Sequence, residues 1–514
     1  MRRETTYHDT RGGDRSHPAF SDVVVTGIAP GGGLYVPDEL PALDLDEVLV
    51  FAEWPYWRRA AAIFSRFGVD LPTGRIDALM REAYGAQWSD PRIAPVVEVR
   101  PDVHVLELWH GPTSAFKDMA LQCMPLFFSE AVSIKQARGA LAEDFLVLVA
   151  TSGDTGKAAL EGFADRPHTK IAVFYPAEGV SDIQRKQMVT QHGENVVVFG
   201  ARGNFDDCQT AVKASFADED FTEELRSRHG LALSSANSIN WGRLLPQIAY
   251  YVSAYADMVA NGGVVAGRPI DVCVPTGNFG NILGAYYAKR LGVPIERLIC
   301  ASNENNVLTD FIATGAYDIS GRDFVTTPSP SMDILVSSNL ERQLYELTRD
   351  PARIVEWMTE LRAGGRFKVD RDTHRAMRSH FTGDFVTNDD SLATIRRVWD
   401  ESGYLLDPHT AVAWEVAERQ RADNPVLVVS TAHWAKFGTD VYRALRGLSC
   451  ADELPADIDG LTGVELLAEV QKLAPEGACV PHALATLDEA TERFSGVVDA
   501  DREGIEGALR DWLG

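Results

Sequence analysis

The chain has 514 residues, of which 45% are hydrophobic and 24% are charged, a balance typical of a globular protein with two or three domains. Its formal charge of −25 argues against a nucleic-acid or anionic-membrane surface, because neutralising phosphates requires clustered Lys and Arg. The same negative field repels anionic substrates, so a site for one must carry its own local cations.

Residues 1–98 are expected to form a mixed N-terminal unit. The segments 56–67 and 76–84 have helical apolar spacing with several aromatic residues, and Pro91 and Pro95 mark the exit. No residues with obvious chemistry gather here. We expect this unit to cover one side of a site formed elsewhere.

Beyond residue 98, short β-branched segments alternate with helical patterns, which favours an α/β fold with parallel or mixed sheets covered by helices and ligands at the carboxyl ends of the strands. The expected regions are 99–260, 261–450 and an acidic helical extension at 451–514, which has fifteen Asp or Glu and four Lys or Arg. The strand-like segments are 103–108, 145–150, 171–175, 196–199, 270–274, 298–301 and 426–429.

The segment 109–122 (WHGPTSAFKDMALQ) joins the first of these strands to a helical pattern at 119–132. Lys117 lies at this junction, where lost solvation and the positive end of a helix dipole lower the pKa of a lysine. A partly neutral lysine attacks carbonyl groups, so Schiff-base chemistry is the first functional hypothesis. The alternative is a solvated lysine in the first turn of a helix.

Two further segments carry polar groups suited to anions. The sequence TSGDTG at 151–156 follows a strand and opens a helix, and it is not a Walker motif because Ala158 replaces the required Ser or Thr. Ser238, Asn240 and Arg243 offer a hydroxyl, an amide and a guanidinium within six residues, a set suited to a phosphate. The cations that either add charge to such a site or form surface salt bridges are Lys157, Arg185 and Lys186.

The sequence PTGNFGN at 275–281 lies between a β-branched strand and an amphipathic helix. Small residues let backbone N–H groups converge, and the helix dipole adds to them, so the loop is suited to a phosphate. It is neither a P-loop nor a dinucleotide fingerprint. The alternative is a tight turn that needs positive φ.

Together, HGPTSAFKD and PTGNFGN resemble the pyridoxal-phosphate enzymes of the tryptophan-synthase-β fold, and most closely the threonine synthase family. The segments 151–156 (TSGDTG), 238–243 (SINWGR) and 431–437 (TAHWAKF) are similar to motifs of that family and lie in the same order. The N-terminal GGLYVP at 32–37 resembles its longer-chain branch. The resemblance extends from about residue 7 to about residue 438.

The resemblance implies a role for each of these segments. Lys117 would carry pyridoxal 5'-phosphate as a Schiff base and then act as acid and base. The cofactor phosphate would lie on the backbone of Gly277, Asn278, Phe279, Gly280 and Asn281, and Thr431 would face the pyridine nitrogen, although alone it reads as a helix cap. The substrate would be bound by Ser152, Asp154 and Thr155 at its carboxylate, and by Ser238, Asn240 and Arg243 at its phosphate.

The implied reaction converts O-phospho-L-homoserine and water to L-threonine and phosphate. One departure from the family pattern is Trp434, where proline is common, and a bulky residue there would reshape the pocket. A related lyase acting on another β- or γ-substituted amino acid is therefore the main alternative, and a non-catalytic descendant is a second one. The second predicts loss of Lys117, Thr431 or the glycines, and all of them are present.

The six cysteines are scattered without a CxxC pair, which favours free thiols in a reducing compartment. The N-terminus lacks the apolar stretch of a secretory signal, and no apolar run reaches membrane-spanning length. We therefore expect a cytoplasmic protein. No histidines have metal-ligand spacing, so we expect no metal site, and His110 and His433 are expected to be structural.

Overall fold

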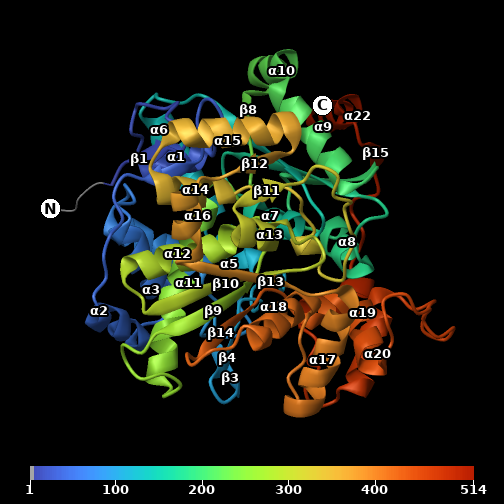
Figure 1. The fold of residues 1–514 in the computed structure, drawn as a ribbon. Coiled ribbons are helices and arrows are strands. Elements are labelled where there is room, and N and C mark those ends of the chain that lie inside the picture. The colour runs from blue at the N-terminus through green and yellow to red at the C-terminus, as the bar shows by residue number, and fades with distance from the viewer. Residues whose placement is uncertain (1–4) are drawn as a thin grey trace.

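The computed structural model describes residues 5–514 and contains two main sheets with helices packed on both faces of each (Figure 1). The larger sheet has the order β13-β10-β9-β14-β4-β3, in which only β3 and β4 are antiparallel. Its strands are β3 (Val96–Arg100), β4 (Val103–Glu107), β9 (Ile270–Pro275), β10 (Ile295–Ser302), β13 (Phe381–Phe385) and β14 (Val426–Ser430). The expected α/β fold class is confirmed.

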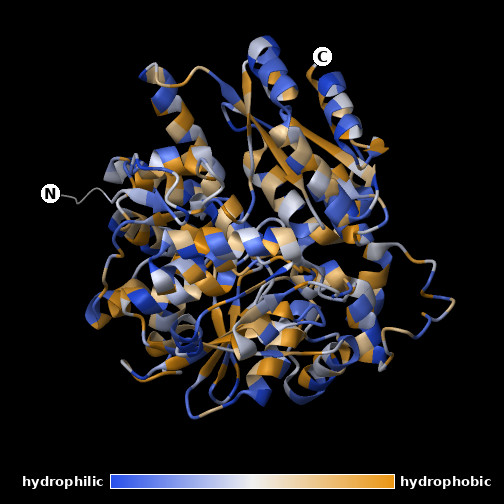
Figure 2. Ribbon diagram, turned by 45° about the horizontal axis from the view of Figure 1, so that its top comes forward, coloured by the Kyte–Doolittle hydropathy of each residue, from blue (hydrophilic) through white to orange (hydrophobic). Residues whose placement is uncertain are grey.

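The smaller sheet is entirely parallel, in the order β15-β7-β6-β5-β8. Its strands are β5 (Asp144–Ala150), β6 (Thr169–Pro176), β7 (Val196–Arg202), β8 (Leu231–Ser234) and β15 (Val497–Asp499). In Figure 2 its strands are mainly orange and the outer helices carry more blue, as expected for strands buried on both faces. Two short antiparallel pairs complete the strands: β1 (Tyr7–Asp9) with β2 (Tyr35–Pro37), and β11 (Ala316–Asp318) with β12 (Arg366–Lys368).

Helices fill the intervals between the strands. The first half of the chain contains α1 (Phe20–Thr26), α2 (Leu45–Val50), α3 (Tyr56–Arg66), α4 (Thr73–Ala83), α5 (Lys117–Leu121), α6 (Met124–Ala137), α7 (Asp154–Phe163), α8 (Asp182–Val189), α9 (Phe205–Ala217), α10 (Glu219–His229) and α11 (Trp241–Ala260). The second half contains α12 (Gly280–Leu291), α13 (Val307–Thr314), α14 (Leu340–Thr348), α15 (Pro351–Gly364), α16 (Arg371–Arg378), α17 (Asn388–Ser402), α18 (Pro408–Arg419), α19 (Gly438–Arg446), α20 (Gly463–Leu473), α21 (His482–Ala485) and α22 (Arg502–Leu513). Short 3₁₀ turns are η1 (Phe51–Glu53), η2 (Pro330–Met332), η3 (Trp434–Phe437) and η4 (Leu487–Glu489).

All seven strand-like segments expected from the sequence are strands, but their pairing does not follow chain order. β4 lies in the expected 99–260 region and pairs with β14, so it belongs to the sheet that the 261–450 region builds. The helical pattern at 119–132 is divided into α5 and α6, and Pro125 lies in the first turn of α6, where a missing N–H costs nothing. Apolar periodicity predicts elements and leaves their partners undetermined.

The C-terminal extension contains the helices α20, α21 and α22 and one short strand, β15. β15 adds a parallel strand to β7, and α22 packs on α9, so the last residues complete the smaller sheet (red, Figure 1). α20 instead packs on α19, beside the larger sheet. The extension therefore contacts both halves of the molecule.

The centre of the molecule is α11, a 20-residue helix with nearly every side chain buried. It packs against α12 and α3, and its tyrosines reach the loop before α12. Within residues 5–514, no helix has both the length and the apolar character needed to cross a bilayer.

Candidate active site

The predicted site residues follow strands of both sheets. Lys117 follows β4, Thr431 follows β14 and the loop 277–281 follows β9, and these three strands are neighbours with parallel directions. The loop 151–154 follows β5 of the smaller sheet. Carboxyl ends of parallel strands share an edge, which explains why chemistry distant in sequence converges here.

Lys117 is the first residue of α5 and only 8% exposed. Its Nζ lies 4.5 Å from the centre of the Phe116 ring and 3.9 Å from Oδ2 of Asp154. Burial lowers the pKa of Lys117 from 10.5 to about 8, against the attraction of Asp154 and with the repulsion of Arg243 and Lys436. A solvated lysine is thereby excluded. Of the two causes expected for the lowered pKa, burial is the main one, because a helix of five residues has a weak dipole.

The loop before Lys117 is held by a fully buried carboxylate. Asp118 accepts hydrogen bonds from Thr113 N at 2.8 Å and from Thr113 Oγ1 at 2.6 Å. A Cβ on Gly111 would lie 2.4 Å from the Asp118 carboxylate, so the close approach requires glycine. The pKa of Asp118 is raised to about 6 by burial. Asp118 thus fixes the backbone that presents Lys117.

Thr431 lies beside the residue that precedes Lys117. Its carbonyl accepts the Phe116 N–H at 2.7 Å, and Ala432 forms an antiparallel bridge with Ala115. Thr431 does not cap a helix, because the side chain of His433 caps η3. The structure therefore places the backbone of Thr431 against the Lys117 loop, and its expected role toward the cofactor ring stays a prediction.

Asp154 is 3% exposed and its carboxylate joins four elements. Oδ1 lies 3.0 Å from Lys436 Nζ and accepts from Gln184 Nε2 at 2.9 Å, while Oδ2 accepts from Ser331 Oγ at 3.1 Å. The two lysines hold the pKa of Asp154 below its usual range against the effect of burial. The carboxylate of Asp154 is thus engaged by protein groups, and its expected role at the substrate carboxylate stays a prediction.

The loop 277–281 has a backbone conformation that fits an anion. Phe279 has a φ of +60°, in the left-handed region, and α12 begins at the next residue. A Cβ on Gly277 would lie 2.8 Å from the carbonyl oxygen of Ser331, the residue that also contacts Asp154. Asn281 accepts hydrogen bonds from Tyr250 and Tyr251, while its Nδ2 is buried without a partner. Backbone groups and this amide are therefore available to a ligand.

The 238–243 segment reaches the same loop through Asn339, whose Nδ2 donates to the carbonyls of Ser238 and Asn278. Arg243 is 3% exposed; it donates to Ala236 O at 2.6 Å, and its Nε is buried without a partner. None of the carboxylates in residues 5–514 forms an ion pair with it, and burial lowers its pKa to about 10. A buried guanidinium without an anion indicates a place for one.

Asn240 differs from its expected substrate contact. Its Oδ1 accepts from Gly242 N at 2.8 Å and caps α11, and its Nδ2 donates to Val24 O at 2.9 Å. Both ends of the amide are therefore engaged in structure. An Asn before a helix is a strong N-cap, and this local preference explains the difference.

Ser152 and Thr155 are half-buried, and neither side chain forms a hydrogen bond within the part of the chain that the structure describes. They remain available to a ligand. The three cations at 157, 185 and 186 instead form salt bridges, with Glu161 for Lys157, Glu492 for Arg185 and Asp488 for Lys186. Of the two readings for these cations, the structure supports the salt bridges.

Sequence reasoning missed four side chains around Asp154 and the loop: Lys436, Gln184, Ser331 and Asn339. Lys436 lies in the 431–437 motif and is fully buried. The apolar residues on both sides of this lysine in the sequence are the feature that could have predicted its burial. Ser331 lies in a loop rich in Ser, Thr and Pro that reads as a surface excursion. No local pattern predicts that such a loop folds back.

The histidines have structural contacts. His110 Nε2 lies 2.8 Å from Glu107 Oε2, and Trp109 lies between the rings of His110 and His433. Burial lowers the pKa of His433 to about 3. Within residues 5–514 no group of three or more His, Cys, Asp or Glu is arranged to hold a metal ion.

Trp434 is 4% exposed and belongs to the apolar cluster between the larger sheet and α17–α20. It therefore contributes to the core.

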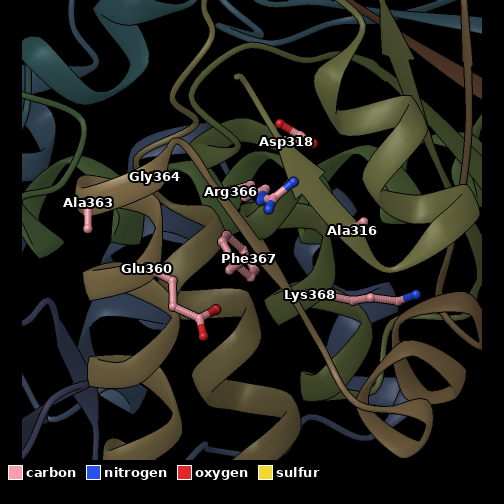
Figure 3. A pocket seen from close by; sticks show the side chains of 8 residues that line it. All are labelled: Ala316, Asp318, Glu360, Ala363, Gly364, Arg366, Phe367 and Lys368. Atoms are coloured by element: carbon pink, nitrogen blue, oxygen red, sulfur yellow. The ribbon is translucent and has the colours of Figure 1, made fainter. Parts of the chain in front are cut away.

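A hollow of about 630 Å³ lies elsewhere, between the β11–β12 pair and α15 (Figure 3). Its charged lining is Asp318, Glu360, Arg366 and Lys368, and it shares no residue with the predicted site. Its lining is mostly exposed side chains, so it has the character of a surface depression.

Comparison with known proteins first defines the class. A family model described as pyridoxal-phosphate dependent enzyme matches residues 90–432. Models described as threonine synthase N terminus and threonine synthase, C-terminal match residues 6–84 and 410–476. The solved structure of threonine synthase from Brucella melitensis with bound pyridoxal phosphate is 35% identical, with a TM-score of 0.83 and 99% of each chain covered. The fold is therefore that of a pyridoxal-phosphate-dependent enzyme.

The relatives define the family within that class. Threonine synthase of Saccharomyces cerevisiae is 36% identical over 489 residues, which cover 89% of this chain and 93% of that protein. The human protein called threonine synthase-like 1 is 44% identical over 437 residues, covering 83% of this chain but only 58% of that longer protein. The chain belongs to the threonine synthase family, and its cofactor is pyridoxal phosphate.

The residues present fit this cofactor. Lys117 is a buried amine with a depressed pKa, and the loop 277–281 offers backbone N–H groups and an unpartnered amide where a glycine permits close approach. Ser331 contacts both Asp154 and the backbone at Gly277, and so connects the lysine to the loop.

Proposed function

We propose that the protein is a threonine synthase, which converts O-phospho-L-homoserine and water to L-threonine and inorganic phosphate. The observation that carries the proposal is Arg243, a buried guanidinium that has no carboxylate partner among residues 5–514 and whose charge acts on Lys117. A substrate that brings its own phosphate supplies the missing anion. The charge of −25 makes such a local cation necessary for an anionic substrate.

In this proposal, Lys117 binds the cofactor covalently, and Gly277, Asn278, Phe279, Gly280 and Asn281 bind its phosphate. Thr431 faces the pyridine nitrogen of the cofactor ring. A hydroxyl cannot keep that nitrogen protonated as a carboxylate would, so the ring is a weaker electron sink. Bound pyridoxal phosphate acidifies the carbon–hydrogen bonds near the substrate amine. Lys117, with a pKa of about 8, would accept the α-proton. A β-proton is then lost as phosphate leaves the γ-carbon, one proton is added at the γ-carbon, and another returns to the α-carbon. Water adds at the β-carbon.

The substrate contacts in the proposal are Ser152 and Thr155 for the carboxylate and Ser238 and Arg243 for the phosphate. Asp154 and Asn240 are left out of this set because their polar atoms already bind other residues. Burial of Lys117, Arg243 and Asp154 keeps water away from these charges and strengthens their interactions.

The test is to incubate the purified enzyme with O-phospho-L-homoserine and to measure threonine and phosphate together. We expect equal amounts of both, and we expect Arg243→Met to raise KM for this substrate at least tenfold while the cofactor stays bound. Lys157→Met, which removes a lysine paired with Glu161, is the control. Phosphate release without threonine contradicts the reaction.

A second candidate is a related lyase acting on another β- or γ-substituted amino acid. It is favoured by the likeness to threonine synthase-like 1, a name that does not state a reaction. Turnover of serine, threonine or O-acetylserine that exceeds turnover of O-phospho-L-homoserine would support it.

A further inference from the structure

The carboxylate of Asp154 lies between two lysines at unequal distances. Lys436 Nζ is 3.0 Å from Oδ1, while Lys117 Nζ is 3.9 Å from Oδ2, which is too far for a hydrogen bond. Lys436 is fully buried and donates a second hydrogen bond, to Thr113 O at 2.9 Å. The Asp154–Lys436 pair is therefore the fixed pair, and Lys117 is the loosely held member.

The position of the carboxylate is set by its remaining partners. Gln184 Nε2 donates to Oδ1 from α8, and Ser331 Oγ donates to Oδ2 from η2. The Ser331 N–H donates to His409 Nε2 at 3.2 Å, so the ring proton of His409 is on Nδ1, 2.8 Å from Asp407 Oδ1. A carboxylate held by Lys436, Gln184 and Ser331 cannot rotate to follow Lys117.

We propose that Asp154 is a positioning residue for Lys117, and that Lys436 balances its charge so that Asp154 holds the Lys117 amine in place without fixing a proton on it. The proposal rests on the proposed role of Lys117 as the cofactor-binding lysine, and it does not depend on which substrate is used. It gives Asp154 and Lys436 a function that differs from substrate binding.

The balance of charge explains the need for both residues. When Lys117 is neutral, the charges of Asp154 and Lys436 cancel. When Lys117 is protonated, these three buried residues together carry one net positive charge. Asp154 alone would trap the proton on Lys117, whereas Lys436 alone would expel it. Two other charged groups act on Lys117: Arg243 from α11, and Asp407, the N-cap residue of α18. The titratable ring of His409, in the first turn of α18, faces Asp154.

The proposal predicts opposite effects for two substitutions, measured in the cofactor-loaded enzyme as the midpoint of the pH titration of its visible absorption band. Asp154→Asn removes the anion, so the cationic form is disfavoured and the midpoint falls by about 1 to 3 pH units. Lys436→Met removes a cation and leaves Asp154 free to attract the Lys117 nitrogen, so the midpoint rises by about 1 unit. A purely structural role does not produce shifts of opposite sign.

Lys157→Met is the matched control, because Lys157 lies on the same helix as Asp154 and pairs with Glu161. It should leave the midpoint unchanged. Circular dichroism establishes that each variant is folded. If Lys436→Met does not fold, Lys436→Arg keeps the charge and should titrate with the wild-type midpoint, whereas a shift of a full unit contradicts the proposal.

Two failures remain distinguishable. If Lys117→Ala keeps the absorption band, the lysine assignment in the proposed function is wrong. If Lys117→Ala loses the band while Asp154→Asn and Lys436→Met titrate with the wild type or shift in the same direction, only the present inference is overturned.

Discussion

At the scale of single residues, the site depends on buried charges. Each of them is either paired with another protein group or available to a ligand. Each carboxylate oxygen of Asp118 and Asp154 accepts a hydrogen bond, whereas one backbone acceptor is found for Arg243 within residues 5–514. Burying an unpaired charge costs stability. The protein therefore gives up stability at Arg243 in order to have a local cation for an anionic ligand.

This cost leads to a prediction for Arg243→Met, which replaces the guanidinium by an apolar group. The free energy of unfolding should rise by about 1 kcal/mol in the absence of substrate, since a desolvated charge is removed. Urea denaturation of the wild type and the variant measures the change. A loss of several kcal/mol would show that Arg243 is structural and that our reading of it is wrong.

The depressed pKa of Lys117 sets the pH dependence of cofactor attachment. The neutral amine is the nucleophile, so the rate of cofactor binding by cofactor-free enzyme should rise with pH and level off above about 8, whereas an ordinary lysine would keep gaining up to 10.5. The appearance of the absorption band reports the rate, and Nα-acetyl-lysine provides the reference. A rate that still climbs above about pH 10 contradicts the burial argument.

At the scale of elements, the loop between β9 and α12 requires close packing against η2. Gly277→Ala places a Cβ 2.8 Å from the Ser331 carbonyl oxygen and must move one of the two backbones. Such overpacking costs about 1 to 3 kcal/mol, so the cofactor affinity should fall by about 5- to 150-fold. Fluorescence titration of the variant with pyridoxal phosphate measures this. Gly507→Ala, where a Cβ meets nothing within 4 Å, is the control and should bind the cofactor normally.

At the scale of the whole molecule, the C-terminal extension completes the core of the smaller sheet. Ile505 and Leu509 are fully buried against residues of β5, β6 and β7. Leu509→Ala should therefore lower the free energy of unfolding by about 2 to 5 kcal/mol. Asp511→Ala, at an exposed position of the same helix, should change it little. Equal stability of the two variants would mean that α22 is not part of the core.

The sequence predicts the elements better than their arrangement. Seven strands and the two strand-to-helix loops follow from local patterns, because β-branched runs and glycine-rich turns act within a few residues. The strand pairs β4–β14 and β15–β7 join segments about 300 residues apart. A local sequence pattern cannot predict such long-range pairings. Lys436 and Ser331 were missed for the same reason, since their contacts with Asp154 are long-range.

The central claim is that Lys117 holds the cofactor beside the loop 277–281. Reduction of the cofactor-loaded enzyme with borohydride, followed by peptide mass mapping, makes that bond permanent and locates it. We predict one pyridoxyl group per chain, on Lys117. A pyridoxyl group on Lys436 or another lysine, with Lys117 unmodified, would contradict the account.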